Sequence, residues 1–212
     1  MIEFDIKRTG MLFIVSAPSG GGKSTIIKAL LDTDKTLSYS VSATTRPPRA
    51  TEVNGRDYHF LALDRFEQLV SENAFYEYAQ VHGNYYGTLK SEVNAKLEQG
   101  YDVLLDVDVQ GSLRLKADMP ECTTIFILPP SLATLEKRLR GRGSDSEEVI
   151  ERRLRNARGE IRMAERYDYI LLNTHLNETI ENMRMIIKAQ HFRSSRIIVR
   201  DPLGTVLSPS KI

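Results

Sequence analysis

Short apolar runs alternate with helix-spaced apolar positions along most of this chain. The run MLFIVS at residues 11–16 predicts a buried strand, and Ile26, Ile27, Leu30 and Leu31 follow it at the spacing of one helix face. The runs YDVLLDVD, TTIFIL and YDYILLN predict three further strands. Strands that alternate with helices favour an α/β fold, in which helices cover both faces of a parallel sheet.

Five further helices are predicted from apolar spacing and end signals. Asp64 is placed to cap a helix that runs to about residue 73, and Gly100 is placed to end an amphipathic helix over residues 88–99. The other three are predicted over residues 132–139, 146–166 and 176–190.

Residues 39–99 interrupt this rhythm with short alternating stretches and the turn signals RPPR and VNG, which predict an inserted lobe. We therefore expect one domain throughout residues 1–212. Its predicted parts are a core over about 11–38 and 100–190, the lobe over about 39–99, a lid over about 138–160, and a tail over 191–212 without a readable motif.

Composition narrows the class of protein. The chain has 212 residues, 41% hydrophobic and 27% charged, with a net charge of +1, so its overall charge does not favour nucleic acid or a membrane surface. No segment has the pattern of a signal peptide or the length of a membrane span. The single cysteine, Cys122, cannot form an intrachain disulfide, which fits a cytoplasmic location, and its apolar surroundings favour a packing role.

The stretch SAPSGGGKST at residues 16–25 follows a predicted strand and precedes a predicted helix. It matches a phosphate-binding loop except that Ala17 stands at the first glycine position. Glycines allow backbone N–H groups to converge on an anion, Lys23 is placed to reach the β and γ phosphates, and Ser24 offers a hydroxyl to Mg²⁺. A plain glycine-rich turn is the alternative, and the flanking strand and helix count against it.

Residues 138–166 contain nine arginines. On a helix that begins near Ser146, five of them point away from the apolar stripe, and we interpret them as a solvated face interleaved with glutamates. A nucleic-acid patch is the alternative, but aromatic residues are not interleaved and many carboxylates are. The five arginines are Arg152, Arg155, Arg158, Arg162 and Arg166, and the glutamates are Glu148, Glu151, Glu160 and Glu165.

Arg153 differs because it lies at the edge of the stripe, from which it could reach into a cleft. Arg138 and Arg142 are four residues apart and so share a helix face. Three arginines that converge on a phosphate chain would neutralise charge that develops during phosphoryl transfer. The sequence GRGSDS between them is typical of the hinge that a closing lid needs.

The lobe and the strand after it carry candidates for a phosphorylated acceptor. Two arginines and two tyrosines form a plausible phosphate cradle: Arg46, Arg49, Tyr58 and Tyr86. Glu77, within the apolar stretch FYEYA, could accept hydrogen bonds from the N1–H and 2-amino groups of guanine. Asp106 and Asp108 lie at the end of a predicted strand and on one face of it, where Asp106 suits the water shell of Mg²⁺ and Asp108 suits the acceptor nucleoside.

The motifs SAPSGGGKST, SVSATTRPPR, EVNGRDYHF, GNYYGT, LLDVDVQG, ILPPS and RLRGRGSDSEE occur in this order, and together they closely resemble the guanylate kinase family over about residues 11–190. The resemblance implies the P-loop nucleoside monophosphate kinase fold, with a GMP-binding lobe and a lid. It also implies the reaction ATP + GMP → ADP + GDP with Mg²⁺, in purine nucleotide metabolism. Ala17 is similar to what bacterial members show.

The resemblance also implies roles residue by residue. GMP would be bound by Ser42, Arg46, Arg49, Tyr58, Glu77, Tyr86, Thr88 and Asp108. ATP would be bound by Ala17, Pro18, Ser19, Gly20, Gly21, Gly22, Lys23, Ser24 and Thr25, with Asn173 at the adenine. Lys23, Arg138, Arg142 and Arg153 would be catalytic, and Mg²⁺ would contact Ser24 and, through water, Asp106. Thr174 and His175 stand where the family often has acidic residues, and Thr51 where a Gly is common.

Two other functions remain open at this point. A non-catalytic scaffold of the same fold would bind phosphopeptides on the cradle, but it would not need the phosphate loop. A kinase for another phosphorylated acceptor would not need Glu77 together with Ser42. A general base is not expected, because the phosphate of GMP is already mostly ionised at neutral pH. The sequence leaves open a homo-oligomer and the preference between GMP and dGMP.

Overall fold

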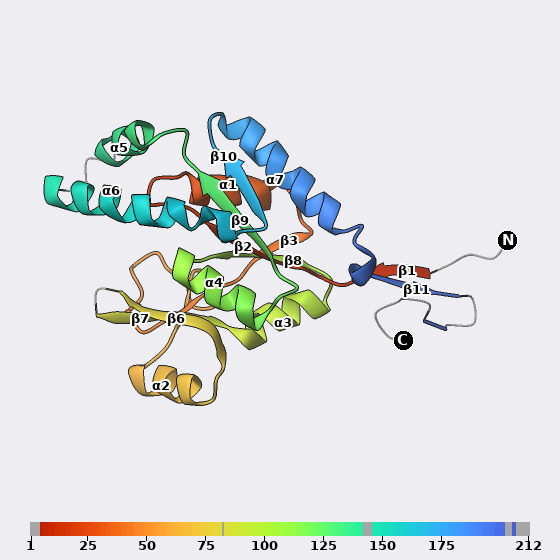
Figure 1. Ribbon diagram of the computed structural model, residues 1–212. Coiled ribbons are helices and arrows are strands. Elements are labelled where there is room, and N and C mark those ends of the chain that lie inside the picture. The colour runs from red at the N-terminus through yellow and green to blue at the C-terminus, as the bar shows by residue number, and fades with distance from the viewer. Residues whose placement is uncertain (1–4, 82, 142–145, 202–204, 207–212) are drawn as a thin grey trace.

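A five-stranded parallel sheet forms the centre of the computed structural model, which describes residues 5–81, 83–141, 146–201 and 205–206. Figure 1 shows helices on both of its faces, and the predicted α/β fold is confirmed. The strand order is β10-β9-β2-β8-β3. These strands are β2 (Leu12–Ser16), β3 (Leu37–Tyr39), β8 (Asp102–Asp106), β9 (Thr123–Leu128) and β10 (Tyr169–Leu172).

The two faces of the sheet are packed by alternate residues of β2, as the two-residue period of a strand requires. Phe13 and Val15 belong to one buried cluster, with side chains of α1 and α7, whereas Leu12 and Ile14 belong to another, with side chains of α3 and α4. The helices are α1 (Lys23–Thr33), α3 (Lys90–Glu98), α4 (Val109–Asp118) and α7 (Leu176–Gln190). This central strand therefore holds both halves of the core and leads directly into the glycine loop.

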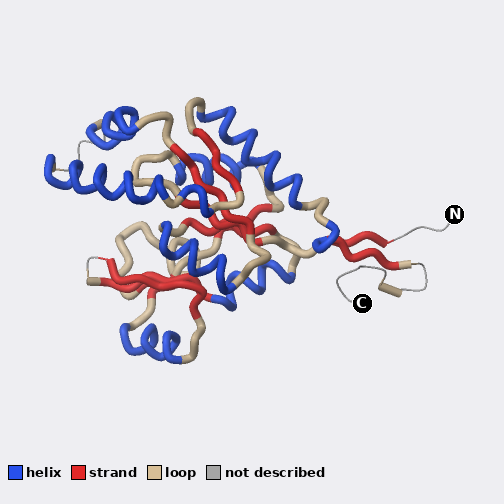
Figure 2. The backbone as a smooth tube through the Cα atoms, in the orientation of Figure 1, coloured by secondary structure: helices blue, strands red, loops and turns tan. Residues whose placement is uncertain are grey.

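A second, four-stranded sheet is built from the segment between β3 and α3, with strand order β5-β4-β7-β6. It lies apart from the parallel sheet in Figure 2 and has its own small core, in which Phe66 stacks on Phe75 with ring centroids 4.4 Å apart. Phe66 comes from the helix that covers this sheet. The elements are β4 (Ala43–Thr44), β5 (His59–Phe60), α2 (Leu63–Ser71), β6 (Phe75–Val81) and β7 (Asn84–Leu89).

Two helices after β9 pack against each other beyond the parallel sheet (Figure 1). They are α5 (Leu132–Arg140) and α6 (Glu147–Arg162), followed by the 3₁₀ turn η1 (Ala164–Arg166). Leu135 and Leu139 of α5 share a buried cluster with Ile150 and Ala157 of α6, which confirms the apolar stripe predicted for this helix. Arg152, Arg155, Arg158, Arg162 and Arg166 are exposed, as predicted.

The two ends of the described chain pair with each other. Strand β1 (Asp5–Arg8) runs antiparallel to β11 (Ile197–Arg200), which follows the 3₁₀ turn η2 (Ser194–Arg196), and this ribbon projects on the side away from α5 and α6 (Figure 1). Asp102, which is fully buried, ties the ribbon to the core. Its carboxylate accepts hydrogen bonds from Arg8 Nη1 at 2.7 Å and from the Met11 N–H at 3.1 Å, and it lies 2.6 Å from His191 Nε2.

Most predicted elements are confirmed, two positions are corrected, and some elements were not predicted. Thr88 lies within strand β7, which runs to Leu89, and does not begin a helix, because α3 starts at Lys90. Asp64 lies in the first turn of α2, whose N-cap is Ala62. Helix α4 and the strands β1, β3 and β11 were not predicted. Gly100 does end α3, with a φ of 86° that favours glycine.

Cys122 packs among buried apolar side chains, and burial raises the pKa of its thiol to about 11, so it has the predicted packing role. None of the helices within the described residues is both long enough and apolar enough to span a membrane.

Candidate functional site

The glycine loop joins the end of β2 to the start of α1 and encloses a hollow of ≈ 220 Å³ lined by residues 17–25. Gly20 and Gly22 have φ values of 89° and 98°, a region that side chains disfavour. Position 17 does not require glycine, because the φ of Ala17 is not positive. Among the described non-glycine residues, only Asn73 has a positive φ. Ser24 and Thr25 lie in the exposed first turn of α1, so backbone N–H groups and hydroxyls surround the hollow.

Lys23, the first residue of α1, reaches the end of the neighbouring strand β8. Its ammonium group forms an ion pair with Asp106 and lies 3.4 Å from the carbonyl oxygen of Val107. The Ser16 hydroxyl donates to the same carbonyl oxygen at 2.9 Å. The loop is thereby fixed to the segment between β8 and α4.

Two of the three predicted arginines reach the glycine loop from different helices. Arg138 of α5 has its Nη1 atom 3.4 Å from the Gly21 carbonyl oxygen, and Arg153 of α6 has its Nη1 atom 3.5 Å from Ser19 Oγ. Arg142 lies outside the described residues. Two positively charged side chains therefore lie beside the hollow of the glycine loop.

A second hollow, of ≈ 420 Å³, adjoins the loop on the side of Arg138 and shares Gly20, Gly22 and Thr25 with the first. Its other lining residues are Asn173, Thr174 and Leu176, which follow β10. Asn173 is predicted at the adenine, and it does line this hollow. Its side chain is nevertheless buried and donates through Nδ2 to the Gly21 carbonyl oxygen at 2.8 Å.

The four-stranded sheet carries the predicted phosphate cradle. Both terminal nitrogens of Arg46 bind the Glu52 carboxylate at 2.9 Å, and the Arg49 backbone N–H donates to it at 2.7 Å. The hydrogen bond to Glu52 raises the pKa of Arg46, and that bond lowers the pKa of Glu52. The Arg46 guanidinium lies 5.4 Å from the Tyr58 ring centre, and Tyr58 meets Tyr86 edge-on at 6.0 Å. A carboxylate thus sits where Arg46 could bind a phosphate.

The carboxylates of Glu77 and Asp108 lie on either side of Gly111, where β6 faces the start of α4. Glu77 accepts a hydrogen bond from Thr88 Oγ1 at 2.7 Å, and Asp108 caps α4 by accepting from the Gly111 N–H at 2.7 Å. Gly111 separates the two groups: a Cβ atom there would lie 3.4 Å from Asp108 Oδ1 and 4.0 Å from Glu77 Oε2. Burial raises the pKa of Glu77, the Thr88 hydrogen bond opposes this, and the charge of Asp108 adds to it.

Ser42 stands next to this sheet, where its carbonyl oxygen accepts from the His59 N–H at 2.9 Å. The structure thus brings Glu77, Thr88 and Asp108 together, and separately Arg46, Tyr58 and Tyr86. The ligands assigned to all of these residues stay predictions.

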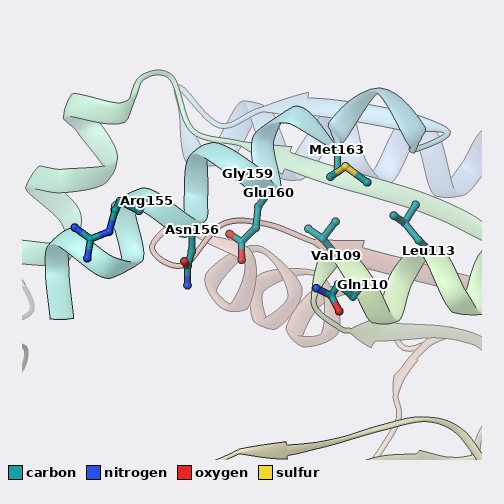
Figure 3. A pocket seen from close by; sticks show the side chains of 8 residues that line it. All are labelled: Val109, Gln110, Leu113, Arg155, Asn156, Gly159, Glu160 and Met163. Atoms are coloured by element: carbon teal, nitrogen blue, oxygen red, sulfur yellow. The ribbon is translucent and has the colours of Figure 1, made fainter.

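Sequence reasoning missed two residues of this region. Glu52 lies in a loop six residues after Arg46, where no periodicity marks a partner. Glu160 was assigned to the solvated face of α6, and that assignment is wrong. Figure 3 shows Glu160 extending from α6 on the side that faces the first turn of α4. Together with Val109 and other residues of the two helices it lines a hollow of ≈ 580 Å³. Burial raises the pKa of Glu160, nearby Lys23 opposes the shift, and Asp108 adds to it.

No group of three histidine, cysteine, aspartate or glutamate side chains within the described residues could by itself hold a metal ion. A magnesium ion that arrives with a nucleotide is usually bound by one or two protein oxygens and by phosphates. The Ser24 hydroxyl and the Asp106 carboxylate, both beside the loop, have the oxygen chemistry that Mg²⁺ prefers.

Known proteins resemble this chain over most of its length. The family model described as guanylate kinase matches residues 9–190. The guanylate kinase of Syntrophotalea carbinolica is 48% identical over 192 residues, which are 91% of each chain. The guanylate kinase of Neisseria meningitidis serogroup A is 49% identical over 189 residues, 89% of this chain and 92% of that one.

A solved structure agrees. The crystal structure of guanylate kinase from Anaplasma phagocytophilum superimposes with a TM-score of 0.70 at 31% identity, covering 91% of this chain and 92% of that chain.

Proposed function

This chain belongs to the guanylate kinase family, and from that we infer that it transfers the γ-phosphoryl group of ATP to GMP and releases ADP and GDP. The observation that supports the assignment of sites concerns three consecutive residues, the last of β8 and the two that follow it. Asp106 and Val107 contact Lys23 of the phosphate loop, and Asp108 shares the surroundings of Gly111 with Glu77 of the small sheet. Donor and acceptor sites thus meet at the carboxyl end of the parallel sheet, where open α/β sheets bind ligands.

On the donor side, the phosphates of ATP would lie in the loop of residues 17–25, with Lys23 along the β and γ phosphates. Arg138 and Arg153 reach this loop from α5 and α6 and would balance the charge that spreads over the transferred group. Arg142 is proposed to join them by its place in the sequence. The adenosine would occupy the adjoining hollow beside Thr174. Magnesium, held by Ser24 and through water by Asp106, would neutralise phosphate charge when bound.

On the acceptor side, Glu77 would accept hydrogen bonds from the N1–H and 2-amino groups of guanine, with Thr88 orienting the carboxylate. Ser42 and Asp108 would complete the nucleoside site. The phosphate of GMP would lie among Arg46, Arg49, Tyr58 and Tyr86, where it would replace Glu52 as the partner of Arg46. Adenine lacks this pair of adjacent donors, so Glu77 gives the site its preference for GMP.

The chemistry assigned to the protein is alignment and charge balance. The attacking oxygen of GMP is already ionised at neutral pH, so none of the described residues is required as a general base. Holding the two phosphates in line removes much of the entropic barrier, and exclusion of water limits transfer to water instead of GMP.

The test is a coupled assay of ADP release with Mg-ATP and GMP, AMP, CMP or UMP offered separately. We expect fast turnover with GMP alone, and loss of that turnover in the Lys23→Met variant. ATP binding without turnover on any of the four acceptors would refute the proposed function.

A further inference from the structure

The Gly21 carbonyl oxygen is the point at which three segments far apart in the sequence meet. It accepts the hydrogen bond from Asn173 Nδ2 at 2.8 Å, and Arg138 Nη1 lies 3.4 Å from it. Arg138 Nη2 lies 3.4 Å from the carbonyl oxygen of Asn173 itself. The phosphate loop is therefore attached both to α5 and to the segment between β10 and α7.

Both ends of the Asn173 side chain are engaged inside the protein. Only 4% of the residue is exposed, and its Oδ1 atom lies 3.3 Å from the hydroxyl of Thr179. A carbonyl oxygen can only accept hydrogen bonds, so the atom that faces Gly21 has to be the amide nitrogen. The surroundings thus fix the orientation of the amide and direct its donor to the loop.

We propose that Asn173 is a positioning residue of the phosphate loop. In a trans peptide the C=O and the following N–H point in opposite directions, and no described peptide bond is cis. By holding the Gly21 carbonyl oxygen on the outer side of the loop, Asn173 keeps the Gly22 N–H directed at the phosphate. The inference rests on the proposed function, because it requires the loop to bind the phosphates of ATP.

The surroundings of Gly22 support this arrangement independently. A Cβ atom on Gly22 would lie only 2.4 Å from Asn173 Nδ2, whereas one on Gly20 would meet the flexible end of Leu135 at 3.2 Å. Gly22 thus permits both a positive φ and the close approach of the asparagine. The asparagine side chain can therefore approach the loop only because residue 22 is a glycine. This contact lies beside the part of the loop that would bind the ATP phosphates.

A role at adenine and a role in the loop predict different ligand dependence. A residue that contacts the base affects ATP but not a polyphosphate without a base. A residue that positions the loop affects both alike. Tripolyphosphate with Mg²⁺ is therefore the probe that separates them, measured beside Mg-ATP by isothermal titration calorimetry on the full chain.

In the Asn173→Ala variant we expect the affinities for Mg-ATP and Mg-tripolyphosphate to fall by the same factor, roughly five- to tenfold, as for the loss of one buried hydrogen bond. The KM for GMP should stay near that of the parent. Asn177→Ala, which makes the same change at an exposed position of α7, should leave both affinities unchanged. If the alanine variant does not fold, Thr179→Val tests the same contact, with a smaller loss that is again equal for the two ligands.

A loss confined to Mg-ATP would overturn the proposal and assign Asn173 to the base, and no loss for either ligand would overturn it as well. Failure of the parent protein to bind Mg-tripolyphosphate would count against the phosphate loop itself, and so against the proposed function.

Discussion

Glu77→Gln replaces a half-buried carboxylate by an amide of the same shape, and it should separate the stability of the free protein from its affinity for GMP. Thr88 Oγ1 can still donate to the remaining oxygen, as it does at 2.7 Å to the carboxylate, so the local structure should persist. The charge is what changes. Burial raises the pKa of Glu77, which means that the ionised form is disfavoured in the free protein.

The sign of the stability effect follows from that pKa. A carboxyl group whose pKa is raised by folding contributes stability at low pH, and that stability is lost as the pH rises through the folded-state pKa. Glutamine carries no charge and does not show this loss. The variant should therefore melt at a higher temperature than the parent at neutral pH, when both are measured without nucleotide.

Binding of GMP should change in the opposite direction. The amide keeps one acceptor for guanine, now uncharged, and places a donor against the second N–H group. We estimate a loss of about 3 kcal/mol, which is roughly a 100-fold rise in the KM for GMP, from one weakened and one lost charge-assisted hydrogen bond. The affinity for Mg-ATP should hardly change.

The assay pairs steady-state kinetics for both substrates with thermal unfolding, and Glu98→Gln on the exposed side of α3 is the matched control. Equal losses for ATP and GMP, or an unchanged KM for GMP, would refute the role given to Glu77. A lower melting temperature would refute the account of its charge.

Three other outcomes are expected. The affinity for guanosine, which has no phosphate to titrate, should weaken as the pH is lowered through the raised pKa of Glu77, and a pH-independent affinity would contradict the guanine contact. Lys23→Met should lower kcat by about 100-fold or more, as for loss of one transition-state charge partner, with folding checked by circular dichroism. Asp102→Asn should cost about 3 kcal/mol and lower Tm by roughly 6–12 °C, because it removes a buried charge from Arg8 and His191, whereas exposed Asp118→Asn should not.

The sequence predicts the elements whose signals are local. The bounds of α7 agree with the prediction because apolar positions at helical spacing fill the whole segment, and β2, β8, β9 and β10 agree because each is a short apolar run. Helix α4 was missed because Gly111 interrupts its first turn. Its signal was nevertheless present, since Asp108 is an N-cap residue whose carboxylate accepts from the Gly111 N–H.

Residue types and motif spacing predict the glycine loop around Lys23 and single out Glu77 and Asp108, which the structure brings together, whereas Thr88 was implied only by the family resemblance. Contacts between distant segments could not be predicted. The hydrogen bond from Asn173 to Gly21 depends on the distance of β10 and α7 from the glycine loop. That distance is set by the packing of the whole parallel sheet, which no local pattern encodes. The pair of Arg46 and Glu52 was missed for a different reason, since a loop has no period from which to infer partners.

The pairing of β1 with β11 has a consequence for synthesis of the chain. Asp5 is opposite Arg200, so β1 cannot pair with its partner strand until the chain as far as Arg200 has left the ribosome. A contact between such distant segments closes a very long loop, and contacts of this kind slow folding. Until then the backbone N–H and C=O groups of β1 form an open strand edge, which is a site where nascent chains associate wrongly. This ribbon should therefore be among the last parts of the protein to form.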